Sequence, residues 1–278
     1  MFVELFVGIT GTIVATYLWE TKIREHVTIH RIKYGADPTM TSLLELYSAL
    51  FPDDGTNYTC EDMLELVLDE NGRRRENYVP VDDVILAAKV QSEVVGFIFC
   101  HYYPERQTGI VSYFGINKSS QVARKQAAPR LLKRLLRILH RAEKPCQWLL
   151  FEIHVPEPDE DKHTNSERRA KGVLFKQTAK HLGIRAVELD FDYNRPRWSL
   201  DPRVEEEPMR LLCATLAKQP LQGTLSKSQV IHLLGTIHLC GYGDYYPVED
   251  RHFQEFHEYL GSRRASYEER LPDPVPIR

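Results

Sequence analysis

The residues with the clearest chemical potential form a basic run, VARKQAAPR (residues 122–130), between an apolar segment and a helix-like stretch. Before the run stands GIVSYFGI, which has the composition of a strand, and after it LLKRLLRIL has the spacing of an amphipathic helix. The start of a helix offers unpaired N–H groups and a positive dipole end, and small residues let the backbone approach a ligand closely. The run therefore predicts a local anion site, or else a connecting loop whose charges are solvated.

A carboxylate stands in the next apolar segment, CQWLLFEIHV. Strand alternation places Glu152 on one face together with His154, opposite Phe151. A carboxylate in such surroundings can accept a proton as a general base. The same charge at a strand end can also simply pair with an arginine, so both roles stay open for Glu152.

Other polar residues carry weaker signals. The hydroxyl groups of Tyr113 and Tyr193 could donate a proton to a leaving group, although packing is the more ordinary role of either ring. The acidic run EPDEDKH (Glu157–His163) could attract a cationic amine such as a polyamine or a lysine side chain, or it is simply solvated. His232 and His238 have no cysteine or carboxylate at ligand spacing, so no metal site is predicted.

The overall composition is that of a folded chain, with 278 residues, 42% hydrophobic residues and a formal net charge of −3. This near-neutral balance argues against a general nucleic-acid binder, whose affinity depends on an excess of lysine and arginine. The five cysteines are scattered, odd in number and without CxxC spacing, which fits neither a metal knuckle nor a disulfide framework. We therefore expect reduced thiols and no nucleic-acid partner.

The N-terminal segment differs from the rest of the chain. The stretch FVELFVGITGTIVATYLW (residues 2–19) is almost wholly apolar apart from Glu4, and its aromatic end resembles an interfacial belt followed by basic residues. These features predict a membrane anchor over residues 1–20, with the following domain on the cytoplasmic face of the membrane. The alternative is a helix or strand that packs on the domain of a cytoplasmic protein.

The middle of the chain alternates between strand and helix patterns, with tight turns between three successive strands that predict an antiparallel meander. Asp37 should cap the first helix, and Ser166 and Gly183 should begin and end the last one. In chain order the patterns predict a strand (27–34), two helices (38–50 and 59–71), three strands (82–90, 93–104 and 109–116), a helix (129–141), a strand (146–155), a helix (166–182), a strand (184–193) and an apolar element, strand or helix (209–216).

These elements predict an α+β fold, a mixed α/β layout around one central sheet flanked by helices. Residues 27–216 would form the main domain. Residues 217–278 would add two helices that close it, followed by a frayed tail, PDPVPIR.

This order of elements, with a basic run between a strand and a helix, resembles the GNAT superfamily of N-acetyltransferases over residues 27–216. The family sheet is mostly antiparallel, and the family pattern (Q/R)-x-x-G-x-(G/A) binds the pyrophosphate of acetyl-coenzyme A through backbone N–H groups. The best register here is RKQAAP (residues 124–129), with alanines in place of glycines and a proline that removes one donor. The phosphate loop is thus a degenerate one, in which basic side chains would supply part of the attraction.

The resemblance implies a binding site for acetyl-coenzyme A or another acyl-coenzyme A along this loop. The residues at the corresponding positions are Ile116, Lys118, Arg124, Lys125, Gln126, Ala127, Ala128 and Arg130.

A later segment, LDFDYNRPRWSLDPRVEEEPMRLL, resembles the closing strands of a bacterial branch of this superfamily through Tyr193, Pro196, Leu200, Pro208 and Met209. The resemblance also implies that the strand carrying Glu152 diverges from its neighbour to admit the thioester. Glu152 would then act as the catalytic base. The family's usual acid is a tyrosine on the next helix, where this chain has Phe175, so Tyr113 and Tyr193 are the alternative acids.

The sequence as a whole predicts an acyl-coenzyme A-dependent N-acyltransferase that transfers an acetyl group to an amine, either a small molecule or a protein lysine. A homodimer is compatible with this prediction. The alternative is a catalytically degenerate module of the same fold that senses a ligand or binds a protein at the membrane. In a third interpretation the N-terminal segment disturbs the membrane and the domain controls it.

Overall fold

The structure is a computed structural model that describes residues 26–33, 37–51, 60, 81–117, 123–155, 162–197, 199–201, 203–216, 223–243 and 250–278. The predicted apolar anchor (residues 1–20) lies outside these residues, as does the helix predicted at 59–71 apart from Cys60. Among the described residues, no helix is both long enough and apolar enough to cross a membrane.

Eight of the described strands form one sheet in the order β1-β2-β3-β4-β5-β8-β6, with β7 also pairing with β8. All of these pairings are antiparallel except that between β4 and β5. The predicted α+β class, with a mostly antiparallel central sheet, is therefore confirmed. The strands are β1 (Val27–Ile32), β2 (Asp82–Val90), β3 (Glu93–Tyr103), β4 (Thr108–Ile116), β5 (Trp148–His154), β6 (Ala186–Glu188), β7 (Tyr193–Arg195) and β8 (Glu207–Thr215).

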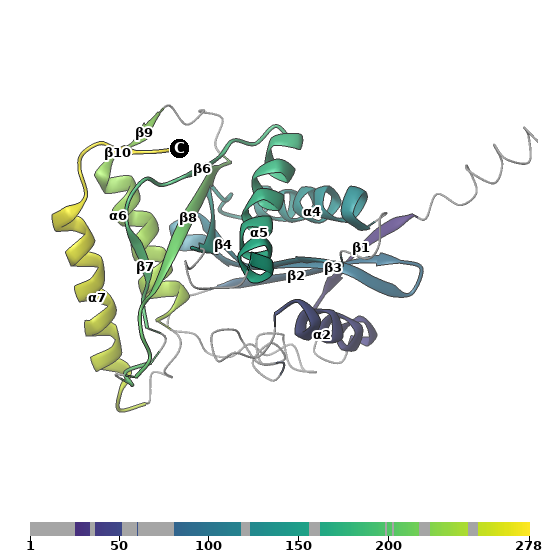
Figure 1. Ribbon diagram of the computed structural model, residues 1–278, viewed down its shortest axis with the longest axis horizontal. Helices are drawn as coiled ribbons and strands as arrows, with labels where there is room; N and C mark the ends of the chain where they lie inside the picture. Colours follow the sequence, from purple (N-terminus) through teal and green to yellow (C-terminus); the bar gives the residue numbers. More distant parts are fainter. Residues whose placement is uncertain are drawn as a thin grey trace, which may run out of the picture.

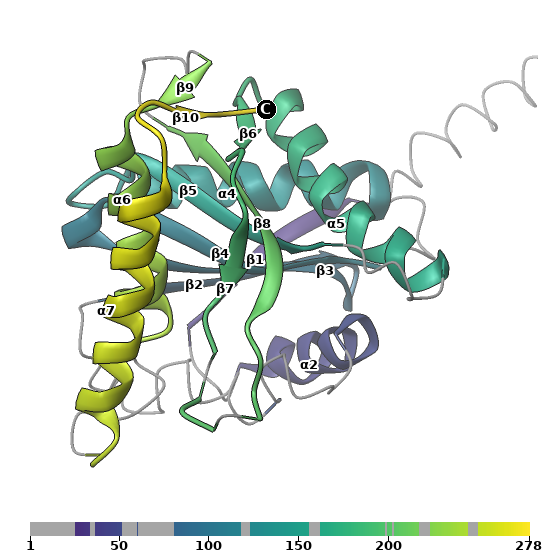
Figure 2. The ribbon, with the colours of Figure 1, turned by 60° about the vertical axis from the view of Figure 1, so that its left-hand side comes forward.

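The helices cover both faces of this sheet. In Figure 1, α4 lies on one side of the central strands and α2 on the other, while α6 and α7 pack at one end. Figure 2 shows α6 and α7 side by side along the β4, β7 and β8 end of the sheet. The helices are α2 (Pro38–Leu50), α4 (Ala128–His140), α5 (Lys162–His181), α6 (Lys227–Gly235) and α7 (Phe253–Arg270).

Three hydrophobic clusters correspond to these layers. The first lies between the sheet and α4 and α5, the second between the sheet and the C-terminal helices, and the third under α2. The predicted start of α2 is confirmed, since the Asp37 side chain accepts a hydrogen bond from the backbone N–H of Thr39 and Pro38 begins the helix. The predicted meander of β2, β3 and β4 is confirmed as well.

Strands β4 and β5 pair over only part of their length. Parallel pairing runs from Thr108 and Trp148 to Val111 and Phe151, although β4 continues to Ile116 and β5 to His154. The register between β3 and β4 shifts at the same level, because Phe99 faces Tyr113 whereas Cys100 faces Val111. The extra residue is Ser112, so β4 carries a β-bulge where it parts from β5, and such bulges are frequent beside active sites.

The predicted phosphate loop at residues 124–129 is helical instead. A π-helical turn, Ala123–Ala127, leads directly into α4, and Ala127 has helical backbone angles. A proline ring clashes with the carbonyl of the residue four positions earlier, and a wider π turn before Pro129 relieves that clash. The predicted helix start at Pro129 is therefore wrong, because α4 begins at Ala128 and the helical turn before it begins at Ala123.

Two further predictions about element ends are wrong. Ser166 is not a cap, because α5 already begins at Lys162. The segment 184–193 is not one strand: β6 and β7 pair separately with β8. Gly183, in contrast, ends α5 as predicted, with a left-handed φ of 75°.

The C-terminal tail is ordered rather than frayed, as one strand of a separate two-stranded sheet. Strand β10 (Val275–Pro276) pairs with β9 (Thr224–Leu225), and Val275 is fully buried. The backbone of Arg278 exchanges hydrogen bonds of 2.8 and 2.9 Å with that of Glu188. Backbone pairing and one buried side chain therefore hold a segment whose composition suggested a loose end.

Candidate active site

Glu152 is the first residue of β5 beyond the last pair that β5 makes with β4. Its neighbour Leu150 lies in the cluster beneath the C-terminal helices, whereas Phe151 lies in the cluster beneath α4 and α5. The predicted alternation is thus confirmed. Glu152 projects to the face of the sheet that α6 and α7 cover, at the point where the central strands part.

Two tyrosine hydroxyl groups hold this carboxylate. Tyr193 donates to Oε1 of Glu152 at 2.5 Å, and Tyr242 donates to Oε2 at 3.0 Å. Arg195 belongs to the same neighbourhood, but its ion pair is with Glu207. The direct partners of Glu152 are therefore two neutral donors, and the alternative of a strand-end charge paired with an arginine is wrong.

Tyr193 is the more deeply buried of these donors. It is 2% exposed, and its ring contacts those of His238 and Tyr267, with centroids 6.2 and 6.0 Å away. Burial first, and then the negative charge of Glu152, raises the pKa of the Tyr193 hydroxyl well above its ordinary value. Tyr193 therefore keeps its proton and acts as a firm hydrogen-bond donor to Glu152.

Tyr267 of α7 secures the strand on which Tyr193 stands. Its hydroxyl accepts a hydrogen bond from the backbone N–H of Asn194 at 2.8 Å and also contacts the Asn194 carbonyl oxygen at 3.3 Å. The C-terminal helix thus fixes β7, and β7 in turn fixes the hydroxyl that orients Glu152.

A polar network lies next to the site. His154 Nδ1 is 2.5 Å from Oε1 of Glu207, and Arg195 contacts the other oxygen of that carboxylate. His154, predicted to share a face with Glu152, is thus engaged by β8. Arg195 is near enough to interact electrostatically with Glu152, but Glu207 balances its charge.

His238 is the least satisfied polar group of this region. It is fully buried, and neither of its ring nitrogens has a hydrogen-bond partner among the described residues. Burial, reinforced by the charges of Arg263 and Arg264, lowers its pKa from 6.5 to about 3. The imidazole is therefore neutral at physiological pH and packs beside Tyr193.

Tyr113, the other predicted acid, lies in a different environment. Its ring makes edge contacts with Tyr47 and Phe51, both at 5.0 Å between centroids, under α2. The structure thus brings Tyr193 to Glu152 and places Tyr113 in an aromatic cluster.

Phe175, at the position where the resemblance implied a tyrosine, is fully buried and packs on Phe151 with centroids 5.1 Å apart. Because Phe151 and Glu152 face opposite sides of β5, Phe175 lies across the sheet from the carboxylate.

The residues expected to hold coenzyme A are only partly described. Lys118 lies outside the described residues, and the side chain of Arg124 does as well. Lys125 is exposed and Gln126 is partly exposed at the start of the helical segment, whereas Ala127, Ala128 and Ile116 are buried. Arg130 donates to the backbone carbonyl oxygen of Val27, which ties α4 to β1. Lys125 and Gln126 are thus the described side chains that remain available to a ligand at this end of α4.

The sequence interpretation missed Tyr242. It stands 90 residues from Glu152, at the end of a π-helical turn (Thr236–Gly241) that follows α6. The segment HLCGYG has the composition of a helix end, and no local pattern indicates a partner in β5. Only the packing of the C-terminal extension against the sheet brings this hydroxyl to the carboxylate.

This arrangement suits proton transfer. A carboxylate oriented by two neutral donors, at the point where two strands stop pairing, can accept a proton from a nucleophile that reaches it. In the part of the chain that the structure describes, no group of histidine, cysteine, aspartate and glutamate could hold a metal ion.

No protein-family model matches this chain, and no curated protein matches it either. Similar solved structures include an aminoglycoside 6'-N-acetyltransferase from Enterococcus faecium, with 14% identity, a TM-score of 0.43, and coverage of 70% of this chain and 99% of that chain. An acetyltransferase of the GNAT family from Streptococcus pneumoniae has 12% identity, a TM-score of 0.42, and coverage of 69% and 100%. An aminoglycoside 6'-N-acetyltransferase complexed with coenzyme A has 16% identity, a TM-score of 0.43, and coverage of 70% and 99%.

Proposed function

We propose that this protein is an acyltransferase that moves the acyl group of an acyl-coenzyme A, most simply acetyl-coenzyme A, to an amine. The observation that carries the proposal is the parting of β4 and β5 beyond Val111 and Phe151, with Glu152 at the first position beyond it. Strand β4 stays paired with β3, and β5 with β8, so the two edges that face the opening are held in place. An extended ligand could align its amide groups with such edges.

In this proposal the amine nitrogen attacks the carbonyl carbon of the thioester, a C–N bond forms and the C–S bond breaks. The proton lost by the nitrogen goes to the Glu152 carboxylate, and the sulfur leaves as a thiolate that is then protonated. A thiol ordinarily titrates near pH 8.5, so the thiolate is an acceptable leaving group without a strong acid beside it. The missing tyrosine at Phe175 therefore does not exclude transfer.

Tyr193 and Tyr242 are proposed to position the carboxylate. The raised pKa of Tyr193 makes it a poor proton donor to a leaving group but a reliable donor to Glu152. We thus assign Tyr193 to orientation of the base, a narrower role than the acid that the sequence suggested. Tyr242 donates a hydrogen bond to the other carboxylate oxygen, so both oxygens of Glu152 are held.

A catalytically inactive module of the same fold is the second candidate. Two observations favour it: Phe175 at the position of the usual acid, and a helical segment where a glycine-rich loop was expected. Such a module would bind an acyl-coenzyme A without transferring its acyl group.

The test uses the full chain. Acetyl-coenzyme A is titrated calorimetrically, and acetylated products are then sought by mass spectrometry in a panel of polyamines, amino sugars and lysine peptides. Glu152→Gln should bind acetyl-coenzyme A normally and lose transfer. Glu205→Gln is the matched control, because Glu205 is an exposed carboxylate near β8. Saturable binding without transfer to any amine would favour the inactive module, and the absence of binding by folded protein would refute both candidates.

A further inference from the structure

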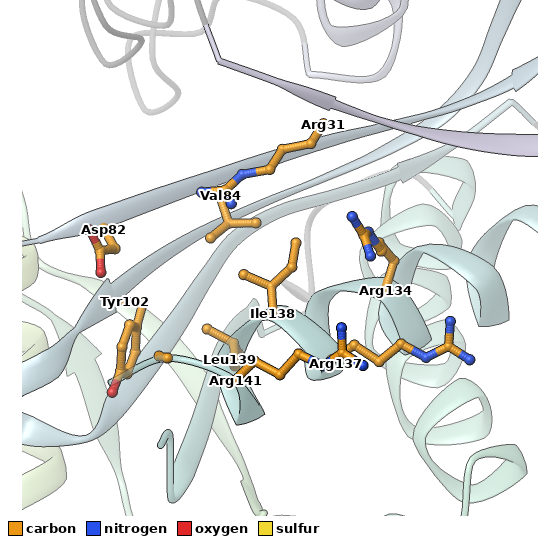
Figure 3. Close-up of a pocket in the computed structure, with 10 residues that line it drawn as sticks. Arg31, Asp82, Val84, Tyr102, Arg134, Arg137, Ile138, Leu139 and Arg141 are labelled. Carbon is orange, nitrogen blue, oxygen red and sulfur yellow. The ribbon is translucent and has the colours of Figure 1, made fainter. Parts of the chain in front are cut away.

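A basic pocket lies at the far end of α4 from the predicted phosphate site. It has a volume of about 370 Å³. Figure 3 shows Arg31 entering it from the strand side, and Arg134, Arg137 and Arg141 from the helix side. These four residues and the surfaces between them are called the arginine pocket below.

The four arginines line one pocket because of how β1 and α4 lie together. Arg134, Arg137 and Arg141 follow one another at helical spacing on α4 and at its end. Arg31 stands on the face of β1 that also carries the core residue Val27, toward α4. The contact of Arg130 with the Val27 carbonyl oxygen aligns the two elements so that their C-terminal halves meet.

No side chain of these four arginines forms a hydrogen bond or an ion pair within the part of the chain that the structure describes. Arginines on the opposite face of the sheet do form ion pairs: Arg195 pairs with Glu207, and Arg263 pairs with Glu206. Asp82 is the one carboxylate among the described residues that line the pocket. Positive charge is thus in excess at this pocket, and it would attract an anion.

The helix dipole explains only part of this arrangement. Basic residues at a helix C-terminus interact favourably with its unpaired carbonyl groups, which accounts for Arg137 and Arg141. It does not account for Arg31, which comes from a strand more than 100 positions earlier in the chain. A structural role at the helix end would not require a fourth guanidinium from another element.

The floor of the pocket is apolar and firmly packed. It is made by Val84, Leu139 and Ile138, of which the first two are buried. Guanidinium groups bind phosphate oxygens in a bidentate way, and an apolar floor suits the uncharged part of a small molecule. The volume is at the lower end of the range for small-molecule sites.

This pocket is separate from the predicted coenzyme A site. Ala127, at the start of α4, and Arg137 are ten positions apart, which corresponds to about 15 Å along a helix. The pocket also opens on the face of the sheet covered by α4, whereas Glu152 projects to the opposite face.

We propose that the arginine pocket binds the phosphate groups of a small anionic ligand, and that this site is independent of the acyl-coenzyme A site. The shared chemistry is a pair of neighbouring phosphates or a phosphate diester, carried either by a dissolved diphosphate or by a lipid headgroup. An acyltransferase would then carry a second ligand site on the reverse side of its sheet.

The test is calorimetric titration of inorganic pyrophosphate into the full-length protein. Arg134→Glu combined with Arg137→Glu should weaken binding at least about tenfold, because two charge reversals replace attraction by repulsion. Lys133→Glu is the matched control: it reverses a charge on the same exposed side of α4 without lining the pocket, and binding should change less than about twofold. Arg137→Gln serves if the double variant does not fold.

Two further experiments test whether the site is separate from the coenzyme A site and whether its ligand is a lipid. Saturating coenzyme A should leave pyrophosphate binding unchanged. Vesicles of phosphatidylglycerol are compared with control vesicles of phosphatidylcholine. Binding of the phosphatidylglycerol vesicles to the wild-type protein, but not to the double variant, would identify a lipid headgroup as the ligand. Absence of saturable binding to both probes would refute the proposal, as would equal loss in the Lys133→Glu control. Full competition by coenzyme A would also refute it, since the pocket would then belong to the acyl-coenzyme A site.

Discussion

The surroundings of Glu152 and the arginine pocket lie on opposite faces of one sheet and handle charge in opposite ways. Glu152 accepts hydrogen bonds from Tyr193 and Tyr242, and its charged neighbours are paired among themselves. The side chains of the four arginines line the pocket without a partner among the described residues. One region is organised before any ligand arrives, whereas the other holds charge that a ligand would balance.

The difference follows from burial. Polar groups in the interior are mostly paired, because an unsatisfied group loses its interaction with water, and His238 is the exception in this region. Exposed guanidinium groups remain hydrated, so they can stay unpaired at little cost. Substitutions around Glu152 should therefore affect both stability and chemistry, whereas substitutions in the arginine pocket should affect ligand binding alone.

The largest expected effect is on transfer. Glu152→Gln should lower the rate of acyl transfer about 10²- to 10⁴-fold, because an amide cannot accept the proton of the amine. Arg137→Glu should leave the rate within about twofold, since its effect on exposed charge is confined to the other face of the sheet. Both rates are measured by mass spectrometry with the best acceptor of the amine panel. An equal loss of transfer rate in the two variants would show that the two regions are not independent in their effect on transfer.

The next effect concerns pH and stability. His238 has a pKa near 3 in the folded protein and about 6.5 when unfolded, so the unfolded chain binds the proton first as the pH falls. Stability should therefore drop by about 2 kcal/mol between pH 6.5 and pH 5 on account of this residue. Urea unfolding at the two pH values should show a smaller drop for His238→Phe than for wild type.

His140→Phe is the control for this experiment, because His140 is exposed on α4. Its pH dependence should equal that of wild type. An unchanged pH dependence in His238→Phe would mean that the buried imidazole finds a partner that the fold does not show.

A smaller effect is expected for the orienting hydroxyl. Tyr193→Phe keeps the ring and removes the hydrogen bond to Glu152, which should cost about 1 kcal/mol of stability. The rate of acyl transfer should fall by a larger factor than the affinity for acetyl-coenzyme A. The reason is that Glu152 loses its orientation while the groups that bind the cofactor remain. The measurements are urea unfolding and the separate values of kcat and KM. A change in KM alone would assign Tyr193 to binding instead.

The smallest expected effect is on the stability of the arginine pocket variants. Arg137→Glu should change the free energy of unfolding by no more than about 0.5 kcal/mol, because the side chain is exposed. Thermal and urea unfolding check this value. A loss of about 2 kcal/mol or more would show that the arginine supports the fold, and the contrast between the two regions would disappear.

Several features of this protein could be predicted from local patterns. Asp37 caps α2, the meander of β2 to β4 forms, and Glu152 lies on the predicted face of β5. These features depend on residue spacing within one element, which obeys the period of a helix or a strand. The predicted cap at Ser166 and the predicted loop conformation of residues 124–129 are wrong, because the helices begin before the residues that suggested their starts.

The central strands, the flanking helices and the place of Glu152 on β5 follow from local residue patterns, because helices and strands repeat with fixed periods along the chain. The hydroxyl groups that contact Glu152 follow from the packing of distant segments. Tyr242 comes from 90 residues away, and Arg31 meets α4 across a similar separation. Contacts of this kind depend on how separate elements pack on the sheet. No repeating pattern in the sequence of either segment indicates which other segment it will contact. The same reason explains why the ordering of the C-terminal tail, through β9 and the backbone of Glu188, could not be predicted from its composition.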